Sequence, residues 1–284
     1  MDKIKIIVDS TSDITLETAE KYDITVLGQT VRFGDETFVE TEQLSSKEFW
    51  KKLKEFDGFP KTAQINITKF TDAFTKFKDR KIIFVCLSSK ASGTIQTATL
   101  AKNMLLEDYP DADITIVDSE SFSYAYGYWV VEAARKAYEG ETDVEKLVKV
   151  IKDGVKNSNV YFAVDTLDYL KNGGRLSPAA KLLGDVLDIK PILSVVDGLI
   201  LNVAKVRGSK KVIPKLIDLM LEDGKDLENQ EIVIFNSDNK ETVEKLKAKI
   251  SEKVNVKGFK DVLIGGTVGA NTGPGVIGLM YLKK

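Results

Sequence analysis

The chain has 284 residues, of which 43% are hydrophobic and 30% charged, and its formal net charge is −2. This length is enough to bury the core of one large or two ordinary domains, and the balanced charge argues against a nucleic-acid binder. The chain contains no histidine and one cysteine, Cys86. These counts exclude a Ser-His-Asp or Cys-His hydrolase, a histidine-bearing or cysteine-rich zinc site, and an internal disulfide.

The apolar runs are as short as strands, well below the ~20 residues that cross a bilayer. The start, Met1-Asp2-Lys3-Ile4, has no signal-peptide pattern. We therefore expect a cytoplasmic protein in which Cys86 is a buried structural thiol.

Short apolar runs alternate with helical periodicity along the first half of the chain. The pattern predicts strands at 4–8, 24–33, 37–39, 82–87 and 114–117, and helices at 15–22, 46–56, 67–77, 92–106, 130–138 and 142–151. Strands separated by helices imply crossover connections, so this half predicts a mostly parallel sheet flanked by helices.

The second half changes character after residue 157. We expect strands at 160–164, 232–235 and 262–264, helices at 165–172, 212–221 and 242–250, and a hairpin of strands 192–196 and 199–204. The turn of that hairpin is Asp197-Gly198, a strong hairpin signal. The fold class is therefore α/β, with an N-terminal domain at 1–157 and a C-terminal α+β domain at 158–284.

Hydroxyl-bearing residues follow three of the expected parallel strands. The sequences are Asp9-Ser10-Thr11, Ser88-Ser89 and Asp118-Ser119. Because ligands of such sheets collect at the carboxyl ends of the strands, the three together predict a polar pocket. Each alone is also explained as a helix cap.

The segment LSSKASGTIQTA, residues 87–98, places Ser92, Gly93 and Thr94 where a helix begins. Free amides and the helix dipole at such a point favour an anion. The chain lacks the GxxxxGK[ST] and GxGxxG patterns, so a carboxylate or phosphate bound without an obligatory cation is the better interpretation. The alternative is that Ser92 only caps the helix.

Three further motifs offer candidate polar contacts. Thr62 follows Pro60 and either caps the next helix or reaches a ligand. Arg175, after Gly173-Gly174, suits an anion or an acidic partner surface, or is a plain exposed loop residue. Asn271 lies in a run with five glycines in eleven residues, 265–275, where the backbone can approach a ligand or another domain closely.

The order of these motifs resembles the DegV family, the FakB-like bacterial fatty acid-binding proteins. The blocks that carry the resemblance are KIIVDSTSDIT, KTAQ, LSSKASGTIQTA, IVDSES, TLDYLKNGGRLS, IKPIL, KVR and NTGPG. Membership implies a two-domain fold with one long-chain fatty acid held between the domains. It also implies a non-enzymatic carrier without a cofactor, which presents the carboxylate to a separate fatty acid kinase for acyl phosphate formation and phospholipid synthesis.

The resemblance assigns roles to individual residues. It implies that Thr62 and Ser92 bind the carboxylate, with Asn271 nearby, and that Arg175 faces the kinase. From the strand ends and the helix start described above we assign Ser10, Gly93, Thr94 and Ser119 to supporting head-group loops, and we allow for a transient contact with a membrane surface. No nucleic acid or metal is expected.

The chain departs from the family pattern at a few positions. Asn271 stands where the family usually has a histidine, so a role that needs an imidazolium is lost. Ala63-Gln64-Ile65-Asn66 lacks the second hydroxyl and the proline of the family, and Leu27-Gly28-Gln29 replaces its usual proline-leucine. Two alternatives stay open: a divergent lipid-sensing or interaction module, and an enzyme for a small acyl or phosphorylated substrate with Asp9 or Asp118 as base.

Overall fold

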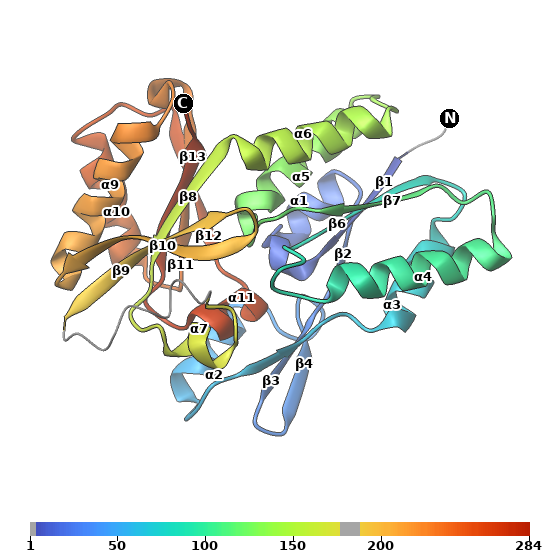
Figure 1. Cartoon of the computed structure of the whole chain (residues 1–284), viewed down its shortest axis with the longest axis horizontal. Coiled ribbons are helices and arrows are strands. Elements are labelled where there is room, and N and C mark those ends of the chain that lie inside the picture. Colours follow the sequence, from blue (N-terminus) through green and yellow to red (C-terminus); the bar gives the residue numbers. More distant parts are fainter. Residues whose placement is uncertain (1–3, 177–187) are drawn as a thin grey trace. The chain divides into compact units, whose positions relative to one another are not determined.

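The computed structural model describes residues 4–176 and 188–284. The chain divides into two compact units (Figure 1), one formed by residues 1–45 and 62–155 and the other by residues 46–61 and 156–284. Ser177, which belongs to one of the blocks quoted above, lies outside the described residues.

The first unit alternates strands and helices as the sequence predicts. Its elements are β1 (Ile4–Asp9), η1 (Ser10–Ser12), α1 (Leu16–Lys21), β2 (Ile24–Leu27), β3 (Thr30–Phe33), β4 (Glu36–Val39), β5 (Lys61–Ala63, at the boundary), α3 (Ile67–Lys76), β6 (Lys81–Cys86), α4 (Thr94–Asp108), β7 (Ile114–Asp118), α5 (Tyr124–Tyr138) and α6 (Val144–Lys156).

A four-stranded parallel sheet forms the centre of this unit, in the order β2-β1-β6-β7. Helices α3 and α4 run along one side of it (Figure 1), where Phe70, Phe74 and Phe84 are fully buried. The rings of Phe70 and Phe84 meet edge to face, 5.0 Å between centroids. The phenylalanine-rich helix therefore builds the core of the unit, and the predicted parallel sheet is confirmed.

The strand predicted at 24–33 is wrong in one respect, because it is two strands, β2 and β3. Gly28 separates them, and a Cβ atom there would lie 2.2 Å from the carbonyl oxygen of Glu40. Only glycine permits so close a backbone approach, so the chain turns away from the parallel sheet at this point. Strand β3 then joins β4 and β5 in a small separate sheet.

The second unit contains a mixed six-stranded sheet in the order β10-β9-β8-β13-β11-β12. Its elements are α2 (Ser46–Glu55), β8 (Ser158–Ala163), α7 (Asp168–Asn172), β9 (Ile189–Val196), β10 (Leu199–Arg207), η2 (Ser209–Lys211), α9 (Val212–Asp223), η3 (Leu227–Asn229), β11 (Glu231–Asn236), α10 (Lys240–Ser251), β12 (Gly258–Leu263), α11 (Gly266–Thr272) and β13 (Ile277–Leu282).

The predicted hairpin is present as β9 and β10, which pair antiparallel. Asp197 and Gly198 both have positive φ, 47° and 73°. This is the conformation that a two-residue turn between twisted strands requires. The C-terminal strand β13 was not predicted; it pairs antiparallel with both β8 and β11.

Residues 46–61 lie in the second unit although they precede the predicted boundary near residue 158. The indole of Trp50 is 1% exposed and donates to the carbonyl oxygen of Ile264 at 2.7 Å. Gly269 of α11 approaches the same helix so closely that a Cβ atom would lie 2.5 Å from Phe49. Aromatic packing of α2 explains why this segment belongs with residues distant in the sequence.

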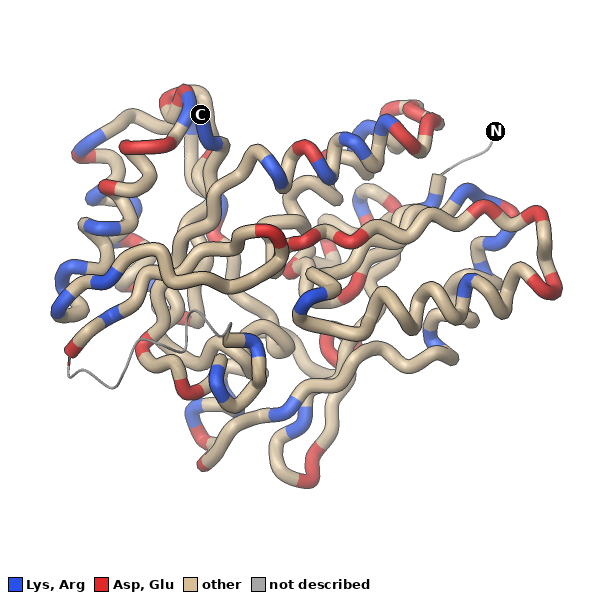
Figure 2. Tube along the Cα trace, in the orientation of Figure 1, with Lys and Arg blue, Asp and Glu red and all other residues tan. Residues whose placement is uncertain are grey.

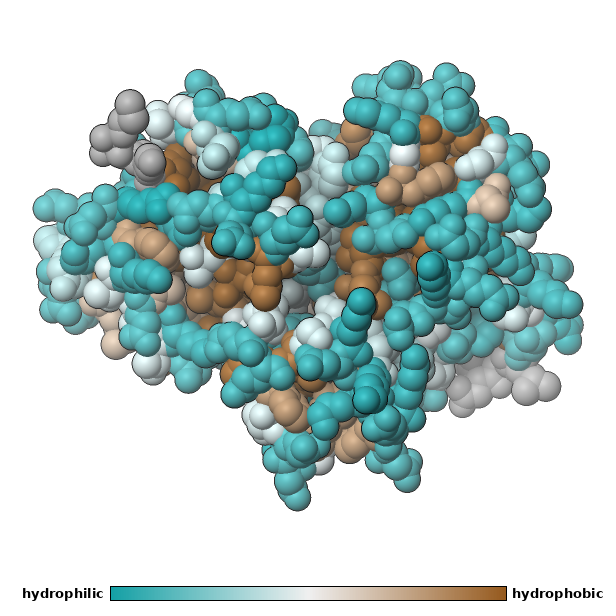
Figure 3. Space-filling model, turned by 180° about the vertical axis from the view of Figure 1, so that it is seen from behind, coloured by the Kyte–Doolittle hydropathy of each residue, from teal (hydrophilic) through white to brown (hydrophobic). Residues whose placement is uncertain are grey.

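Charged residues of both signs are interspersed along each unit (Figure 2). Hydrophilic residues cover most of the face drawn in Figure 3, and hydrophobic residues gather there in smaller patches. Among residues 4–176 and 188–284, no helix combines the length and the apolar character needed to cross a bilayer.

Candidate functional site

The carboxyl ends of β1, β6 and β7 lie side by side at one edge of the parallel sheet. The register pairs Val8 with Val85, and Cys86 with Asp118. Three of the hydroxyl-rich segments that the sequence singled out therefore meet at this edge. The residues 87–93 that connect β6 to α4, here named the 87–93 loop, lie between the other two.

Asp9 is fully buried at the end of β1 and its carboxylate accepts four hydrogen bonds. One oxygen accepts from the Thr11 amide at 2.9 Å, the Tyr126 hydroxyl at 2.7 Å and the Thr11 hydroxyl; the other accepts from the Leu87 amide at 2.8 Å. Burial raises the pKa of Asp9, and the four hydrogen bonds partly oppose that change. Burial and the neighbouring Asp9 also raise the pKa of Tyr126. A fully enclosed carboxylate does not reach a substrate, so the structure gives no support to Asp9 as a base.

Asp118 holds the same loop from the end of β7. Its carboxylate accepts from the Ser89 amide, 3.2 and 3.3 Å from its two oxygens, and from the Glu120 amide at 2.9 Å. Between these two contacts the Ser88 amide donates to the carbonyl oxygen of Ser121 at 3.0 Å. Three successive amides of the loop are thus fixed by β1, by β7 and by Ser121, which follows β7.

The loop leaves its polar groups open at the start of α4. The amides of Ser92 and Gly93 have no hydrogen-bond partner in the described part of the chain. The half-buried Ser92 hydroxyl accepts from the Thr94 amide at 3.3 Å and lies 2.9 Å from the buried Thr94 hydroxyl. Gly93, not Ser92, is the N-cap residue, and no side-chain hydrogen bond caps the helix.

Thr62 lies on β5, close along the chain to a contact with the same helix start. A Cβ atom on Gly93 would lie 2.5 Å from the Gln64 side chain, which also donates to the Thr97 hydroxyl at 3.0 Å. Asn66 caps α3 by accepting from the Lys69 amide at 3.1 Å, so Thr62 is not needed as that cap. The Thr62 hydroxyl is half-buried and unpaired within residues 4–176 and 188–284.

Two other hydroxyls proposed for the supporting loops are engaged inside the protein. Ser10 donates to Glu40 at 2.6 Å and accepts from the Gln29 amide at 3.0 Å. Ser119 accepts from the Ser121 amide at 3.2 Å. Both residues are buried, and they shape the edge of the sheet.

Asn271 and Arg175 belong to the second unit. The Asn271 side-chain amide donates to the carbonyl oxygen of Thr267 at 2.8 Å. Its Oδ1 is so close to Gly173 that a Cβ atom on that residue would lie only 2.1 Å from it. Asn271 therefore packs on the Gly173-Gly174 turn, where glycine is required. The half-buried Arg175 guanidinium donates to the carbonyl oxygen of Gly173. Part of the glycine-rich run 265–275 forms the helix α11, which the sequence did not predict.

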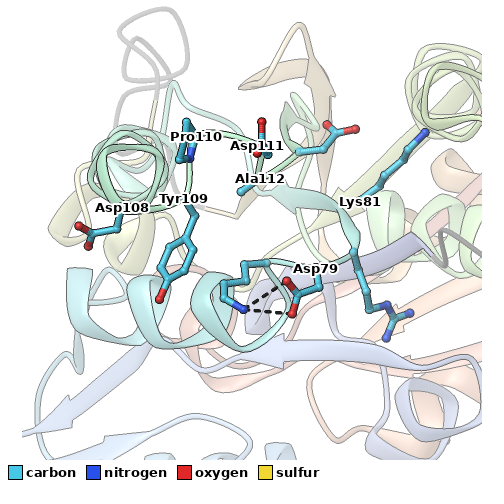
Figure 4. Close-up of a pocket in the computed structure, with 10 residues that line it drawn as sticks. Asp79, Lys81, Asp108, Tyr109, Pro110, Asp111 and Ala112 are labelled. Carbon is cyan, nitrogen blue, oxygen red and sulfur yellow. Dashed lines mark hydrogen bonds and ion pairs between the residues drawn. The ribbon is translucent and has the colours of Figure 1, made fainter.

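A surface pocket of about 680 Å³ lies at the opposite edge of the parallel sheet, before β6 and β7 (Figure 4). Its wall is mostly charged and includes Asp79, which pairs with Lys78, together with Asp108 and Asp111. Burying an acyl chain against exposed charges gains little, because the gain scales with apolar area removed from water. The described residues contain no cluster of three or more His, Cys, Asp or Glu arranged for a metal.

The first unit thus offers uncharged hydrogen-bond donors that can bind an anion without the help of a cation. The hydroxyls of Thr62 and Ser92 and the amides of Ser92 and Gly93 can donate to an anion such as a carboxylate. The acceptor role of Asp9 and Asp118 toward this loop was not predicted. The only sequence signal was an aspartate directly after each of the two predicted strands, 4–8 and 114–117, which also fits an ordinary cap.

Comparison with known proteins gives a consistent result along the chain. Residues 3–284 match the family described as "Uncharacterised protein, DegV family". A DegV domain-containing protein of Clostridium perfringens is 32% identical over 286 residues, covering 99% of both chains. Two solved structures are similar in fold. "DegV, a fatty acid binding protein from Bacillus subtilis" has a TM-score of 0.85 and 28% identity and covers 100% of both chains. A stearic acid-binding protein from Eubacterium ventriosum has a TM-score of 0.87 and 25% identity, covering 100% of this chain and 99% of its own.

Proposed function

This chain belongs to the DegV family, and from that premise we propose that it binds one long-chain fatty acid whose carboxylate is held by Thr62 and Ser92. The fatty acid-binding relatives from Bacillus subtilis and Eubacterium ventriosum support the ligand class, because they align over essentially the whole chain. Asn271 is the third residue that we assign to the carboxylate. The protein acts as a carrier, with no catalytic residue and no cofactor of its own.

The observation that carries the proposal is the set of unpaired, uncharged donors at the start of α4. Such donors hold a carboxylate in place, whereas a bidentate arginine would occupy both oxygens. The acyl chain supplies most of the affinity: at ~0.8 kcal/mol per buried CH₂, a sixteen-carbon tail contributes roughly 12 kcal/mol before the costs of association. The polar contacts then mainly fix the position of the head group.

We further propose that the bound carboxylate is presented to a separate fatty acid kinase. The kinase transfers the γ-phosphoryl group of ATP to a carboxylate oxygen, and the acyl phosphate and ADP are the products. The acyl phosphate then enters phospholipid synthesis. Arg175 is the residue assigned to the kinase-facing surface, and its main-chain contact with Gly173 links it to the turn on which Asn271 packs.

Lipid binding is tested by native mass spectrometry of the purified protein, before and after denaturing extraction, followed by titration with palmitate and oleate. We expect a one-to-one complex. Thr62→Val and Ser92→Ala should each raise the Kd for palmitate about fivefold, the effect of one net hydrogen bond of ~1 kcal/mol. Ser251→Ala, at an exposed position on α10, should leave the Kd unchanged. Absence of any bound acyl chain, together with no uptake of either acid, would refute the function.

Service to a kinase is tested by adding a fatty acid kinase and ATP to the palmitate complex and measuring palmitoyl phosphate. We expect its formation, and a reduced rate with Arg175→Ala at unchanged palmitate affinity. The second candidate function is a lipid-sensing module, and it is based on Asn271, which stands where the family usually has a histidine. Retained lipid without phosphorylation, with activity gained in Asn271→His, would indicate a lipid-sensing module instead.

A further inference from the structure

The 87–93 loop is held from both sides by carboxylates at strand ends. Asp9, at the end of β1, accepts the Leu87 amide at 2.8 Å, and Asp118, at the end of β7, accepts the Ser89 amide at 3.2 Å. The two strands lie on opposite sides of β6 in the sheet. The loop is therefore clamped at alternate residues as soon as it leaves its strand.

Hydrogen bonds occupy the loop amides in strict succession. The Ser88 amide donates to Ser121, the Lys90 amide to the Ser88 hydroxyl at 3.2 Å, and the Ala91 amide to the Ser88 carbonyl oxygen at 3.0 Å. Together with the bonds to Asp9 and Asp118, these use every amide from residue 87 to residue 91. The next two amides, of Ser92 and Gly93, are the ones without a partner among the described residues.

We propose that Asp9 and Asp118 are positioning residues of the carboxylate site: by holding the amides of Leu87 and Ser89 they aim the amides and the hydroxyl at 92–93 toward the ligand head group. This inference rests on the proposed fatty acid binding. Neither aspartate touches the ligand. Their role is to remove the alternative arrangements of the loop before the ligand arrives.

The physical reason is preorganisation. A site built from neutral donors gains little from each contact, so the cost of ordering a seven-residue loop on binding would cancel much of that gain. The negative charges of the two carboxylates are themselves satisfied by donors, four at Asp9 and the Ser89 and Glu120 amides at Asp118. Asp9 also connects the loop to α5 through the Tyr126 hydroxyl, 2.7 Å away.

The test compares the Kd of palmitate with that of 1-hexadecanol, which has the same tail and no carboxylate. Asp118→Ala should raise the Kd of palmitate about tenfold and that of hexadecanol less than twofold, because only the head-group contacts are disturbed. Asp118→Asn keeps one acceptor oxygen for the Ser89 amide and should restore most of the discrimination. A purely structural defect would weaken both ligands alike.

Asp113→Ala is the matched control, because Asp113 is an exposed aspartate just before the same strand, at the pocket of Figure 4. It removes an identical charge from the other end of β7, and both Kd values should stay as in the wild type. Asp9→Asn should act like Asp118→Ala, because the two oxygens of Asp9 accept from different donors and asparagine keeps only one of these oxygens. Asp9 is fully buried, so the Kd values of Asp9→Asn are interpreted only if thermal unfolding shows that this variant is folded. If it is not folded, the comparison of Asp118→Ala with Asp118→Asn decides the test.

The outcomes separate this inference from the function beneath it. Wild-type protein that binds no palmitate overturns the proposed function. Wild-type protein that binds palmitate, with Asp118→Ala retaining the palmitate-to-hexadecanol ratio, overturns the positioning role alone. An equal loss of both ligands in Asp118→Ala does the same, since it shows a general loosening of the unit. A selective loss of palmitate with rescue by asparagine supports the inference.

Discussion

Ser10 provides a sharp test of which hydroxyls at the sheet edge serve structure and which serve the ligand. Its side chain is 3% exposed, donates to Glu40 at 2.6 Å and accepts from the Gln29 amide at 3.0 Å. Ser10→Ala removes a hydrogen bond to a carboxylate, of about 1.5–3 kcal/mol, and leaves a buried amide without its acceptor. We therefore expect the free energy of unfolding to fall by about 3 kcal/mol and the palmitate Kd to change less than twofold.

The two tryptophans allow the free energy of unfolding to be measured separately for each unit, because Trp129 lies in the first unit and Trp50 in the second. Urea unfolding followed by ¹⁹F NMR of 5-fluorotryptophan protein resolves the two signals. With an m-value of about 3 kcal/mol/M, the midpoint of the Trp129 transition should drop by about 1 M in Ser10→Ala. Ser251→Ala, exposed on α10, should leave both midpoints unchanged.

A loss of less than about 1 kcal/mol on the Trp129 signal of Ser10→Ala would contradict this prediction, since both hydrogen bonds would then contribute little to stability. Unchanged stability with a palmitate Kd raised about tenfold would also contradict it. That second result would place the Ser10 hydroxyl among the ligand contacts.

Three further predictions follow from buried groups in the first unit. Gln29 is 3% exposed and its Nε2 has no partner among the described residues. Gln29→Met should therefore raise the free energy of unfolding by about 1 kcal/mol in urea titrations, and a lower free energy of unfolding would contradict this. Gly154→Ala would place a Cβ atom 2.0 Å from the Trp129 ring and should cost about 1–2 kcal/mol despite the better helix propensity of alanine, whereas Gly258→Ala enters open space and should be neutral. Burial raises the pKa of Asp9 above its ordinary value of 3.8, so the folded state binds the proton more tightly than the unfolded state does. The free energy of unfolding of the wild type, relative to Asp9→Asn, should therefore fall as the pH rises from about 4 to the raised pKa, and then level off. A rise over that pH range would contradict the assignment.

Local signals explain how much of the fold could be predicted from the sequence. Alternating apolar runs and helical periodicity predict the parallel sheet, and Asp197-Gly198 predicts the hairpin through its need for positive φ. Contacts between residues distant in the sequence explain the misses. The helix α11 was not predicted: its Gly269 packs against Phe49, and nothing near Gly269 in the sequence indicates that neighbour.

The candidate site shows the same division between local and distant information. The sequence identifies the hydroxyl-rich strand ends, and the parallel topology brings them together. It does not reveal that Gln64 contacts Gly93, because this depends on where β5 lies beside α4. The roles of Thr62, Ser92 and Asn271 therefore stay predictions. The structure shows internal hydrogen bonds of Ser92 and Asn271, and a half-buried Thr62 hydroxyl without a partner in the described part of the chain.

Some of the candidate ligand groups differ from their polar neighbours in having no hydrogen-bond partner inside the described part of the protein. At this edge Ser10 is bonded to Glu40, Thr11 to Asp9, and Ser119 to Ser121, so three residues of the right type are already engaged. Because a buried polar group must be paired, most hydroxyls near a strand end are committed to folding. The Thr62 hydroxyl and the amides at 92 and 93 are among the groups that have no partner in the described part of the chain. An anion placed there would complete the hydrogen bonding of the edge, which is why a small set of neutral donors suffices for a ligand whose affinity comes from its tail.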